Sequence, residues 1–405
     1  MTQILKIAYR NLGRNRRRTL FSALALALGL GLLIFMASFI QGEMGSAMEM
    51  TIRLQSGHLQ VRSLSYDENK TSLKWEDLVE NPQMIVSQIA ALPQVKDATP
   101  RLLATGMMVH RDESIGVRII GIDPRAKAND PYRDGLLEGQ FLTADDREGI
   151  LIGKPLADKL GLHVGDQVNC SINTSNGDVD EQRFTVRGIY TTDTSAFDNV
   201  TILLPLAKAQ TITRTENHAS LIFILLHDKD QTEQVARALA NLPYKVTTWI
   251  EMNDLLIQYE NFANAYISIL YLIVLAITAT VIVNTLIMAV FERTREIGIL
   301  AAIGWRSGEI LSMFLVETGL LAVGGIILGL IFGIAVTSYF AARGFYLGDM
   351  GISGMLIGNT IRPELTLEDT VTLSTATLVI TLLAGLYPAI MAARLQPTEA
   401  LRGGK

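Results

Sequence analysis

The amino-acid sequence predicts an α-helical membrane protein with four transmembrane helices and one large mixed α/β extracytoplasmic domain. Four stretches of the chain contain no Asp, Glu, Lys or Arg, and each exceeds the roughly 20 residues that a helix needs to cross a bilayer. These stretches are 19–42, 261–291, 318–342 and 370–393. About 220 mostly polar residues separate the first stretch from the second, which is enough chain to bury a core of its own.

The amino-terminal flank predicts the orientation of these helices. Residues 1–18 carry only basic charges, and Lys and Arg accumulate on the cytoplasmic side of short flanking segments. Both chain ends are therefore expected in the cytoplasm, together with the 292–309 loop and the 394–405 tail. The 43–260 domain and the short 343–369 loop are expected on the outside. The basic residues of the flank are Lys6, Arg10, Arg14, Arg16, Arg17 and Arg18.

The composition of the outer domain excludes one class of partner and one means of stabilisation. Segment 43–260 holds 21 basic and 31 acidic residues, a net charge near −10. A nucleic-acid partner requires a basic face, so the sequence predicts no nucleic-acid binding. Cys170 is the single cysteine of the chain. Because no intrachain disulfide can form, the outer domain must be stabilised by its own core.

Residues 1–18 are expected to form a basic amphipathic helix on the inner membrane surface. Apolar residues between positions 4 and 12 fall on one helical face, a pattern typical of interfacial helices. A disordered basic tail is the alternative. A cleaved signal peptide is disfavoured, because the uncharged stretch 19–42 is longer than a usual signal core and no convincing small-x-small cleavage site precedes a mature start. The apolar face consists of Ile4, Leu5, Ala8 and Leu12.

Strand-like runs alternate with helices across the outer domain, which predicts a mixed α/β fold. One helix is expected from Asn81-Pro82 through Ala91, because Asn before a proline is a typical helix start. Another is expected at about 231–241. With their neighbouring strands they predict two βαβ-like halves of one subdomain, and the segment at about 135–200 predicts a smaller, mostly β insertion. The strand-like runs are 58–61, 117–121, 183–186, 221–225 and 245–249.

Helical periodicity continues beyond the membrane at both ends of the outer domain. Such apolar stripes predict helical stalks that carry motion between the membrane and the domain. Short amphipathic helices resting on the outer leaflet are the alternative. The stripe after the first span consists of Met44, Met48 and Ile52, and the stripe before the second consists of Leu255, Leu256, Tyr259 and Phe262.

Three features inside the membrane helices have structural interpretations. The third helix, expected over 310–342, repeats glycine at every fourth position, which permits close helix packing either within the subunit or across a dimer. Glu317 lies near the inner end of this helix, where a structural role is favoured over an ion pathway. Asn284 of the second helix is expected to hydrogen-bond another helix. The repeated glycines are Gly325, Gly329 and Gly333.

Motifs in four parts of the chain, in the correct order, resemble those of FtsX-like (MacB-type) permeases of ABC systems. The loop after the second helix reads FERTREIGILAAIGW (291–305), and the end of the chain reads YPAIMAARLQPTEALR (387–402). The beginning contains AYRNL (8–12) and RRRTL (16–20). In the outer domain, IGKPLA (152–157) and LGLHVGD (160–166) are similar to the periplasmic core of that family. The resemblance spans essentially the whole chain.

This resemblance implies a four-helix permease that works as a dimer in the cell (inner) membrane. A separate cytoplasmic ATPase would bind ATP and Mg, and this chain would bind no cofactor or metal. The outer domain would consist of a porter-like part and a small β, sabre-like part.

The 292–309 loop is predicted to couple to that ATPase through a short helix. Its paired charges suit charge-assisted bonds to a partner, while Ile297, Leu300 and Ile303 offer an apolar face. An ordinary charged loop that satisfies the positive-inside rule is the alternative. The predicted coupling residues are Glu292, Arg293, Arg295, Glu296, Gly298 and Gly304.

The sequence contains no catalytic motif of its own. No His-Glu-x-x-His or Gly-x-Ser-x-Gly pattern occurs, and the five histidines are isolated from one another. The segment from Gly149 to Pro155 resembles a phosphate loop only superficially, because its glycine spacing is short and Pro155 replaces the required Ser or Thr. Catalysis is therefore expected in the ATPase partner.

Three functions fit these predictions. The layout favours extraction or export of a lipoprotein or other amphiphilic molecule from membrane lipid, as in lipoprotein-releasing permeases of the LolC and LolE type, with a periplasmic carrier as a further partner. Mechanotransmission for peptide or antibiotic efflux is the second. A scaffold that activates a cell-wall hydrolase is the third, and the large two-part outer domain disfavours it. Neighbouring genes for a carrier, a membrane-fusion protein or a hydrolase would distinguish the three.

Overall fold

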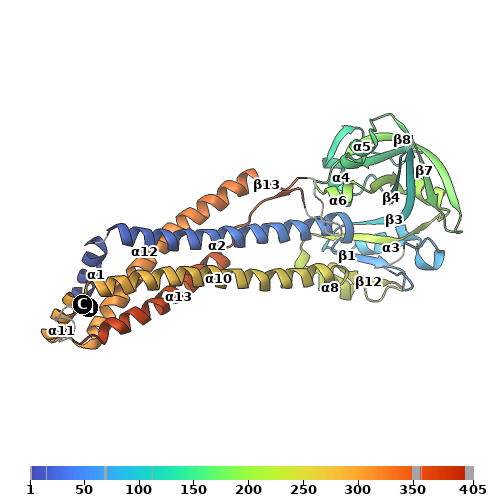
Figure 1. The fold of residues 1–405 in the computed structure, drawn as a ribbon. Coiled ribbons are helices and arrows are strands. Elements are labelled where there is room, and N and C mark those ends of the chain that lie inside the picture. The colour runs from blue at the N-terminus through green and yellow to red at the C-terminus, as the bar shows by residue number, and fades with distance from the viewer. Residues whose placement is uncertain are drawn as a thin grey trace. The chain divides into compact units, whose positions relative to one another are not determined.

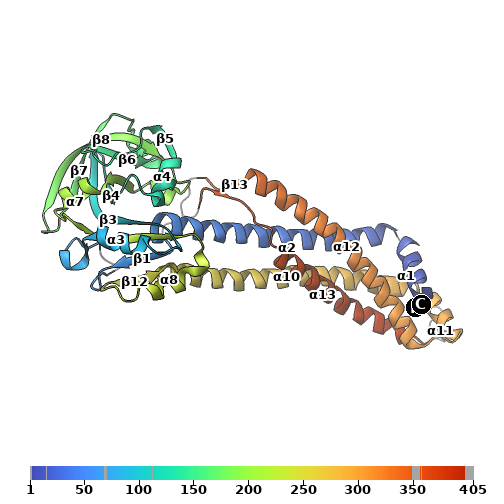
Figure 2. The ribbon, with the colours of Figure 1, turned by 180° about the vertical axis from the view of Figure 1, so that it is seen from behind.

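The computed structural model describes residues 2–14, 16–67, 71–111, 113–348, 356 and 358–396. The chain divides into two compact units (Figures 1 and 2). We call them the helical unit and the sheet unit and describe each by itself. The helical unit comprises Met1–Glu43, Glu260–Phe345 and Ile361–Lys405, and the sheet unit comprises Met44–Tyr259 and Tyr346–Thr360.

Four helices are long and apolar enough to cross a membrane, which confirms the four predicted spans. They are α2 (Arg16–Thr51), α10 (Asp254–Glu292), α12 (Ser307–Arg343) and α13 (Leu367–Ala393). Each is longer than the uncharged stretch that predicted it. The expected helical extensions are present, because α2 runs past Met48 to Thr51 and α10 begins at Asp254. Two short strands, β13 (Phe345–Tyr346) and β14 (Thr360–Ile361), pair between α12 and α13.

The glycine repeat of α12 packs against α2 of the same chain. A Cβ added at Gly329 would lie 3.0 Å from Leu30 Cβ, and one at Gly333 would lie 3.1 Å from Ile34 Cβ. A Cβ at Gly325 would lie 2.9 Å from the Cβ of Leu26. The two helices therefore approach more closely than any side chain on this face would permit. Of the two interpretations that the sequence left open, the structure shows packing within the subunit.

The amino-terminal segment forms helix α1 (Thr2–Arg14). Ala8 is fully buried, and Leu12 packs against the apolar cluster that contains Leu26 of α2. Leu5, expected on the same face, is instead 55% exposed. The neighbouring Tyr9 is 74% exposed. The expected apolar face is thus divided between the interior of the helical unit and its surface. The side chain of Ile4 lies outside the described residues.

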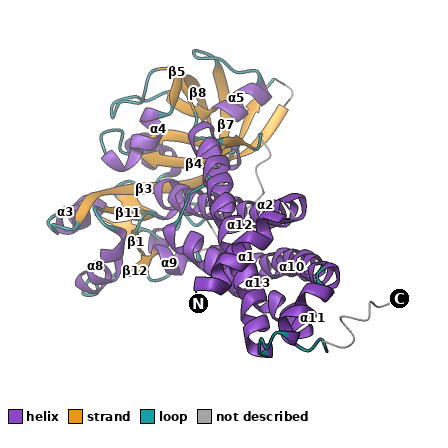
Figure 3. Ribbon diagram, turned by 90° about the vertical axis from the view of Figure 1, so that its left-hand side faces the viewer, coloured by secondary structure: helices purple, strands orange, loops and turns teal. Residues whose placement is uncertain are grey.

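One half of the sheet unit contains the two βαβ-like units that the sequence predicts, here joined in a split βαβ topology (Figure 3). Two strand–helix–strand units interlock, so that the antiparallel strand order is β12-β1-β11-β3. The two helices lie between consecutive strands of each unit, and their apolar residues share one core with the sheet. The elements are β1 (Leu59–Arg62), α3 (Pro82–Ala90), β3 (Val95–His110), β11 (Leu221–Leu226), α8 (Thr232–Ala238) and β12 (Lys245–Thr248).

The other half closes into a barrel. Strand β3 pairs with β4 and β7, and the circuit continues from β4 through β9, β6 and β8 back to β7, while β5 adds to the outside of β8. Closure leaves these six strands without a free edge. The strands are β4 (Glu113–Ile122), β5 (Leu136–Gly139), β6 (Gly149–Gly153), β7 (Gln167–Asn173), β8 (Val179–Tyr190) and β9 (Thr201–Pro205).

The barrel differs from the β insertion expected at about 135–200. That segment supplies β5 to β8, but the barrel also requires β4, β9 and the second half of β3. The expected start of the β insertion is wrong because β3 contributes its first half to one sheet and its second half to the other. Such sharing depends on pairing between distant segments, which hydrophobic periodicity does not report.

Short elements complete the sheet unit. A π-helical turn, Ile52–Ser56, which we call the π-turn, follows α2 directly. Strands β2 (Val79–Glu80) and β10 (His218–Ala219) pair with each other. The remaining helices are α4 (Asp130–Asp134), α5 (Lys154–Leu160), α6 (Ser195–Asp198), α7 (Leu206–Thr213) and α9 (Trp249–Met252).

A buried carboxylate closes the loop between β8 and β9. Asp198 has no exposed surface, and it accepts hydrogen bonds from the hydroxyl of Thr191 at 2.9 Å and from the amide of Thr192 at 2.8 Å. The hydroxyl of Thr192 donates to its other oxygen at 2.7 Å. Burial raises the pKa of Asp198 to about 6, although these hydrogen bonds favour the charged form.

We expect Asp198 to make the stability of the sheet unit pH-dependent. Because its pKa is higher in the folded state, its stabilising contribution is complete below about pH 4 and is lost as the pH rises through about 6, a change of about 3 kcal/mol. Asp198→Asn should remove this step, and exposed Asp134→Asn should retain it. Thermal unfolding of the full chain in detergent between about pH 4 and pH 8 measures the difference. Parallel curves for wild type and Asp198→Asn would contradict it.

Candidate functional site

The connection between α10 and α12, residues 292–309, contains helix α11 (Thr294–Ala302). Arg293 leaves the helical conformation at φ −110° and ψ 11°, and α10 ends before it at Glu292. The hydroxyl of Thr294 then donates to the carbonyl of Val290 at 3.0 Å, which satisfies one of the acceptors that a helix end leaves open. We call residues 292–309 the connection.

Gly304 ends α11 through its backbone conformation. Its φ of +104° is strained for any residue that has a side chain. The amide of Gly304 donates to Ala301 and that of Trp305 donates to Leu300, both at 3.1 Å, which together form a Schellman motif. Helix α12 begins shortly afterwards, where the amide of Arg306 donates to the Glu309 carboxylate at 2.8 Å.

Arg293 is buried and does not face a partner. Its side chain is 3% exposed and that of Glu317 is 4% exposed, and one guanidinium nitrogen donates to both Glu317 oxygens at 3.3 and 3.2 Å. The other terminal nitrogen donates to the carbonyl of Asn11 at 3.0 Å. Arg293 therefore ties the end of α10 to α12 and to α1. The structural role expected for Glu317 agrees with this pairing. The sequence predicts Arg293 in the coupling surface, but its side chain lies inside the unit.

Two further charges of the connection pair with the amino-terminal segment. Glu292 accepts from Arg18 of α2 at 2.6 Å, and Glu296 accepts from Arg14 of α1 at 2.5 Å. Both carboxylates are about half exposed, at 49% and 48%, so these pairs contribute little to stability. They do bring the basic flank, which the sequence treated as a topological signal, against the connection.

The apolar residues of α11 divide between the interior and the surface. Ile297 and Gly298 are buried, and Ile297 packs in a cluster with Phe314 of α12 and Ala389 of α13. Ile297 and Leu300, expected on the docking face, therefore serve the interior of the unit. Ile303 remains 74% exposed.

The exposed face of α11 has a different composition from the one expected. Arg295, Ile299 and Ile303 follow one another at four-residue spacing and are all exposed. Among the described residues, Arg295 is the one charge of the predicted set with no ion pair. We call Arg295, Ile299 and Ile303 the α11 face. Within the residues that the structure describes, no three His, Cys, Asp or Glu side chains lie together in a way that could hold a metal ion.

Glu317, the pairing partner of Arg293, stands out in the sequence by its position. Glu317 is the single acidic residue of α12 beyond its first turn, and a carboxylate in that setting requires a cation. The arginine that supplies the cation is 24 positions away, so sequence spacing alone does not identify it.

Comparison with known families agrees with the class of protein that the fold defines, a permease with four membrane helices and a large mixed α/β domain. The family model for the MacB-like periplasmic core domain matches residues 19–242, and that for the FtsX-like permease C-terminal region matches residues 268–397. The chain belongs to the FtsX/MacB-type permeases of ABC transporters.

Individual relatives have more specific names. The chain is 25% identical over 395 residues to the lipoprotein-releasing system transmembrane protein LolE of Haemophilus influenzae, covering 94% of this chain and 93% of that protein. It is 29% identical over 283 residues to LolC of Xylella fastidiosa, covering 66% of each. It is also 25% identical over 331 residues to the macrolide export ATP-binding/permease protein MacB 2 of Aeromonas hydrophila, covering 76% of this chain and 47% of that protein.

We expect the Arg293–Glu317 pair to hold the connection in place. Glu317→Gln should destabilise the helical unit by about 3–5 kcal/mol, because it leaves the buried charge of Arg293 uncompensated. Replacing both residues with Met removes both charges and should recover most of that loss. The thermal unfolding midpoint in detergent measures both effects.

The exposed pair supplies the control for this prediction. Glu292→Gln removes the partner of Arg18 and should cost at most about 1 kcal/mol, because water screens that pair. If Glu317→Gln were no more destabilising than Glu292→Gln, the buried pair would not be the anchor of the connection.

Proposed function

We propose that this chain is the membrane subunit of a transporter driven by a separate cytoplasmic ATPase, and that it extracts a lipoprotein or another amphiphilic molecule from the membrane. Membership of the ABC permease family supports the general activity. The names of LolE and LolC, which match across much of the chain, support lipoprotein release as the specific task. The MacB match keeps efflux of a macrolide or peptide as the second candidate.

The α11 face is the surface that supports ATPase coupling. Ile299 and Ile303 are apolar side chains exposed beside the unpaired charge of Arg295. A short helix with an apolar stripe and one charge suits a groove on a partner protein. Beneath it, Ile297 and the Arg293–Glu317 pair fix α11 to α12. A push on α11 would therefore act on the transmembrane helices directly.

The proposed orientation places the connection in the cytoplasm, where ATP is available. The structure brings Arg14 and Arg18 of the basic flank against Glu296 and Glu292. The flank and the connection therefore lie at the same end of the helical unit. Because short basic flanks remain cytoplasmic, both belong inside, and the sheet unit belongs outside.

A second permease subunit is the other proposed partner. Asn284 is expected to hydrogen-bond another helix, and its side chain is exposed on α10. Large apolar side chains such as Leu272, Ile277 and Met288 are exposed along the same helix. An amide facing lipid is unfavourable, so its position on this surface supports coverage by a helix of another subunit.

Two glutamate substitutions on the α11 face test the proposed function. In liposomes that contain the chain and its ATPase, ATP should release a triacylated lipoprotein from the wild-type complex. Arg295→Glu combined with Ile303→Glu should reduce recovery of the ATPase, and ATP-dependent release, by about tenfold or more, because both substitutions disrupt one docking face.

The matched control is Leu367→Glu, which places the same charge on a residue that is 80% exposed at the start of α13. Its ATPase binding and release should remain at the wild-type level. Full activity of the α11 double variant would exclude this face as the coupling surface. ATPase binding without release of any lipoprotein would instead favour macrolide or peptide efflux.

Impermeant thiol labelling tests the orientation. Asp178→Cys on the turn between β7 and β8 should react in intact spheroplasts, and Gly308→Cys at the start of α12 should react only after the membrane is opened. The native Cys170 contributes little background, because it is buried and burial raises the pKa of its thiol to about 12. The reverse labelling pattern would place the sheet unit in the cytoplasm.

A further inference from the structure

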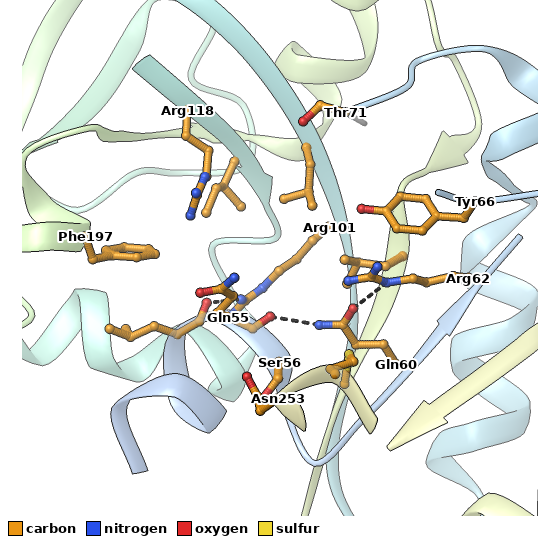
Figure 4. Close-up of a pocket in the computed structure, with 15 residues that line it drawn as sticks. Gln55, Ser56, Gln60, Arg62, Tyr66, Thr71, Arg101, Arg118, Phe197 and Asn253 are labelled. Carbon is orange, nitrogen blue, oxygen red and sulfur yellow. Dashed lines mark hydrogen bonds between the residues drawn. The ribbon is translucent and has the colours of Figure 1, made fainter. Parts of the chain in front are cut away.

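The sheet unit contains a cavity of about 260 Å³ that the transport proposal does not use. Its walls come from the π-turn, from strands β1, β3 and β4, and from the residues that end α9. Figure 4 shows the side chains that line it. The polar lining includes Gln55, Ser56, Gln60 and Asn253. The cavity therefore offers hydrogen-bond partners along one wall.

Arg101 supplies a buried positive charge to this cavity. The residue is 2% exposed and lies in β3 where that strand passes from one sheet to the other. One terminal nitrogen donates to the carbonyl of Leu54 at 2.9 Å, and the other donates to Ala128 and Asn129 oxygens at 3.3 and 3.1 Å. Its guanidinium stacks 3.6 Å from the ring of Phe223. The Nε atom is buried and has no hydrogen-bond partner among the described residues.

The charge of Arg101 has no carboxylate bonded to it. All its acceptors are neutral oxygens, and burial lowers its pKa from the ordinary value. Asp97 is nearby, but its carboxylate accepts instead from the amides of Ala98 and Ala128, at 3.0 and 2.7 Å. A buried cation without a counter-charge is unfavourable unless an anion completes it.

A second arginine points into the same cavity. The side chain of Arg118 extends from β4 toward the Arg101 guanidinium in Figure 4. No described residue forms an ion pair with Arg118, and no described lining residue is acidic. An anion between the two guanidinium groups would interact favourably with both charges.

We propose that this cavity binds a phosphate-bearing ligand. Arg101 Nε and the Arg118 guanidinium would donate to the phosphate oxygens, which is the pairing that guanidinium groups favour. The neutral amides would bind hydroxyls next to the phosphate. Phe197, Leu103 and Ile120 give the cavity an apolar side, which suits a small organic substituent. The ligand is therefore a phosphate ester of glycerol size or inorganic phosphate itself.

Calorimetric titration of the full chain, purified in an uncharged maltoside detergent, tests this site. The probes are inorganic phosphate, glycerol 3-phosphate and a short-chain phosphatidylglycerol below its micellar concentration. Arg118→Gln should weaken binding of the preferred probe by about tenfold or more, because it removes a charge-assisted hydrogen bond. Arg183→Gln, on the exposed side of β8, should bind as wild type does.

A second variant addresses the buried charge. Arg101→Lys retains the charge but removes Nε and the planar donor group, so binding should again fall by about tenfold. If that variant unfolds, Arg118→Gln alone decides, because Arg118 is exposed. Unfolding of both variants in the absence of ligand would assign the two arginines to the fold and overturn the proposal.

The probes also identify the source of the phosphate. Tighter binding of the short-chain lipid than of glycerol 3-phosphate would indicate a lipid headgroup, and the reverse order would indicate a free phosphate ester. No heat of binding for any probe up to about 10 mM would overturn the site. Equal binding to wild type and to Arg118→Gln would overturn it as well. Neither result bears on ATPase coupling at α11.

Discussion

The buried ion pair between Arg293 and Glu317 is the constraint on which the helical unit depends. It joins the end of α10 to α12, and the bond from Arg293 to Asn11 adds α1 to the same point. Because neither charge tolerates isolation in an apolar surrounding, the three segments must stay together. The direction of α11 follows from this. With Ile297 turned into the unit, the residues at four-residue spacing from Arg295 have to face outward.

The sheet unit contains a buried arginine in a different state. Arg293 has a carboxylate as its counter-charge, whereas Arg101 is bonded to carbonyl and amide oxygens. The Nε atom of each arginine is buried and has no hydrogen-bond partner among the described residues. Carbonyl dipoles compensate a cation only in part, so the charge of Arg293 is neutralised within the chain and that of Arg101 is not. If Arg101 only had to donate hydrogen bonds to these neutral oxygens, an uncharged donor side chain would be sufficient. The charge itself therefore requires an explanation, and the convergence of Arg118 on the same cavity supplies one.

The sequence was sufficient for features that depend on local pattern. The four spans, the helix that begins at Pro82 and the two βαβ-like halves follow from hydropathy, the proline and periodicity, each read within a short window. The cap expected from Asn81 is wrong, because Asn81 is left-handed at φ 51° and its side chain does not bond the helix. The barrel and the partner of Arg293 could not be found in this way, because both depend on contacts between distant positions. The α11 face shows an intermediate case. The sequence predicts a short amphipathic helix, but it places Ile297 and Leu300 on the docking face. In the structure both side chains pack in the cluster that contains Phe314 of α12.

Helix α2 and the π-turn that follows it contact both the glycine face of α12 and Arg101. Between Leu26 and Ile34 it packs against the glycines of α12, and α12 carries Glu317. The π-turn follows α2 without interruption, and there Leu54 gives its carbonyl to Arg101. A force on α11 would reach α12 through the buried pair and α2 through the glycine face. An anion bound by the unused Nε of Arg101 would add to this guanidinium while the bond to Leu54 stays in place.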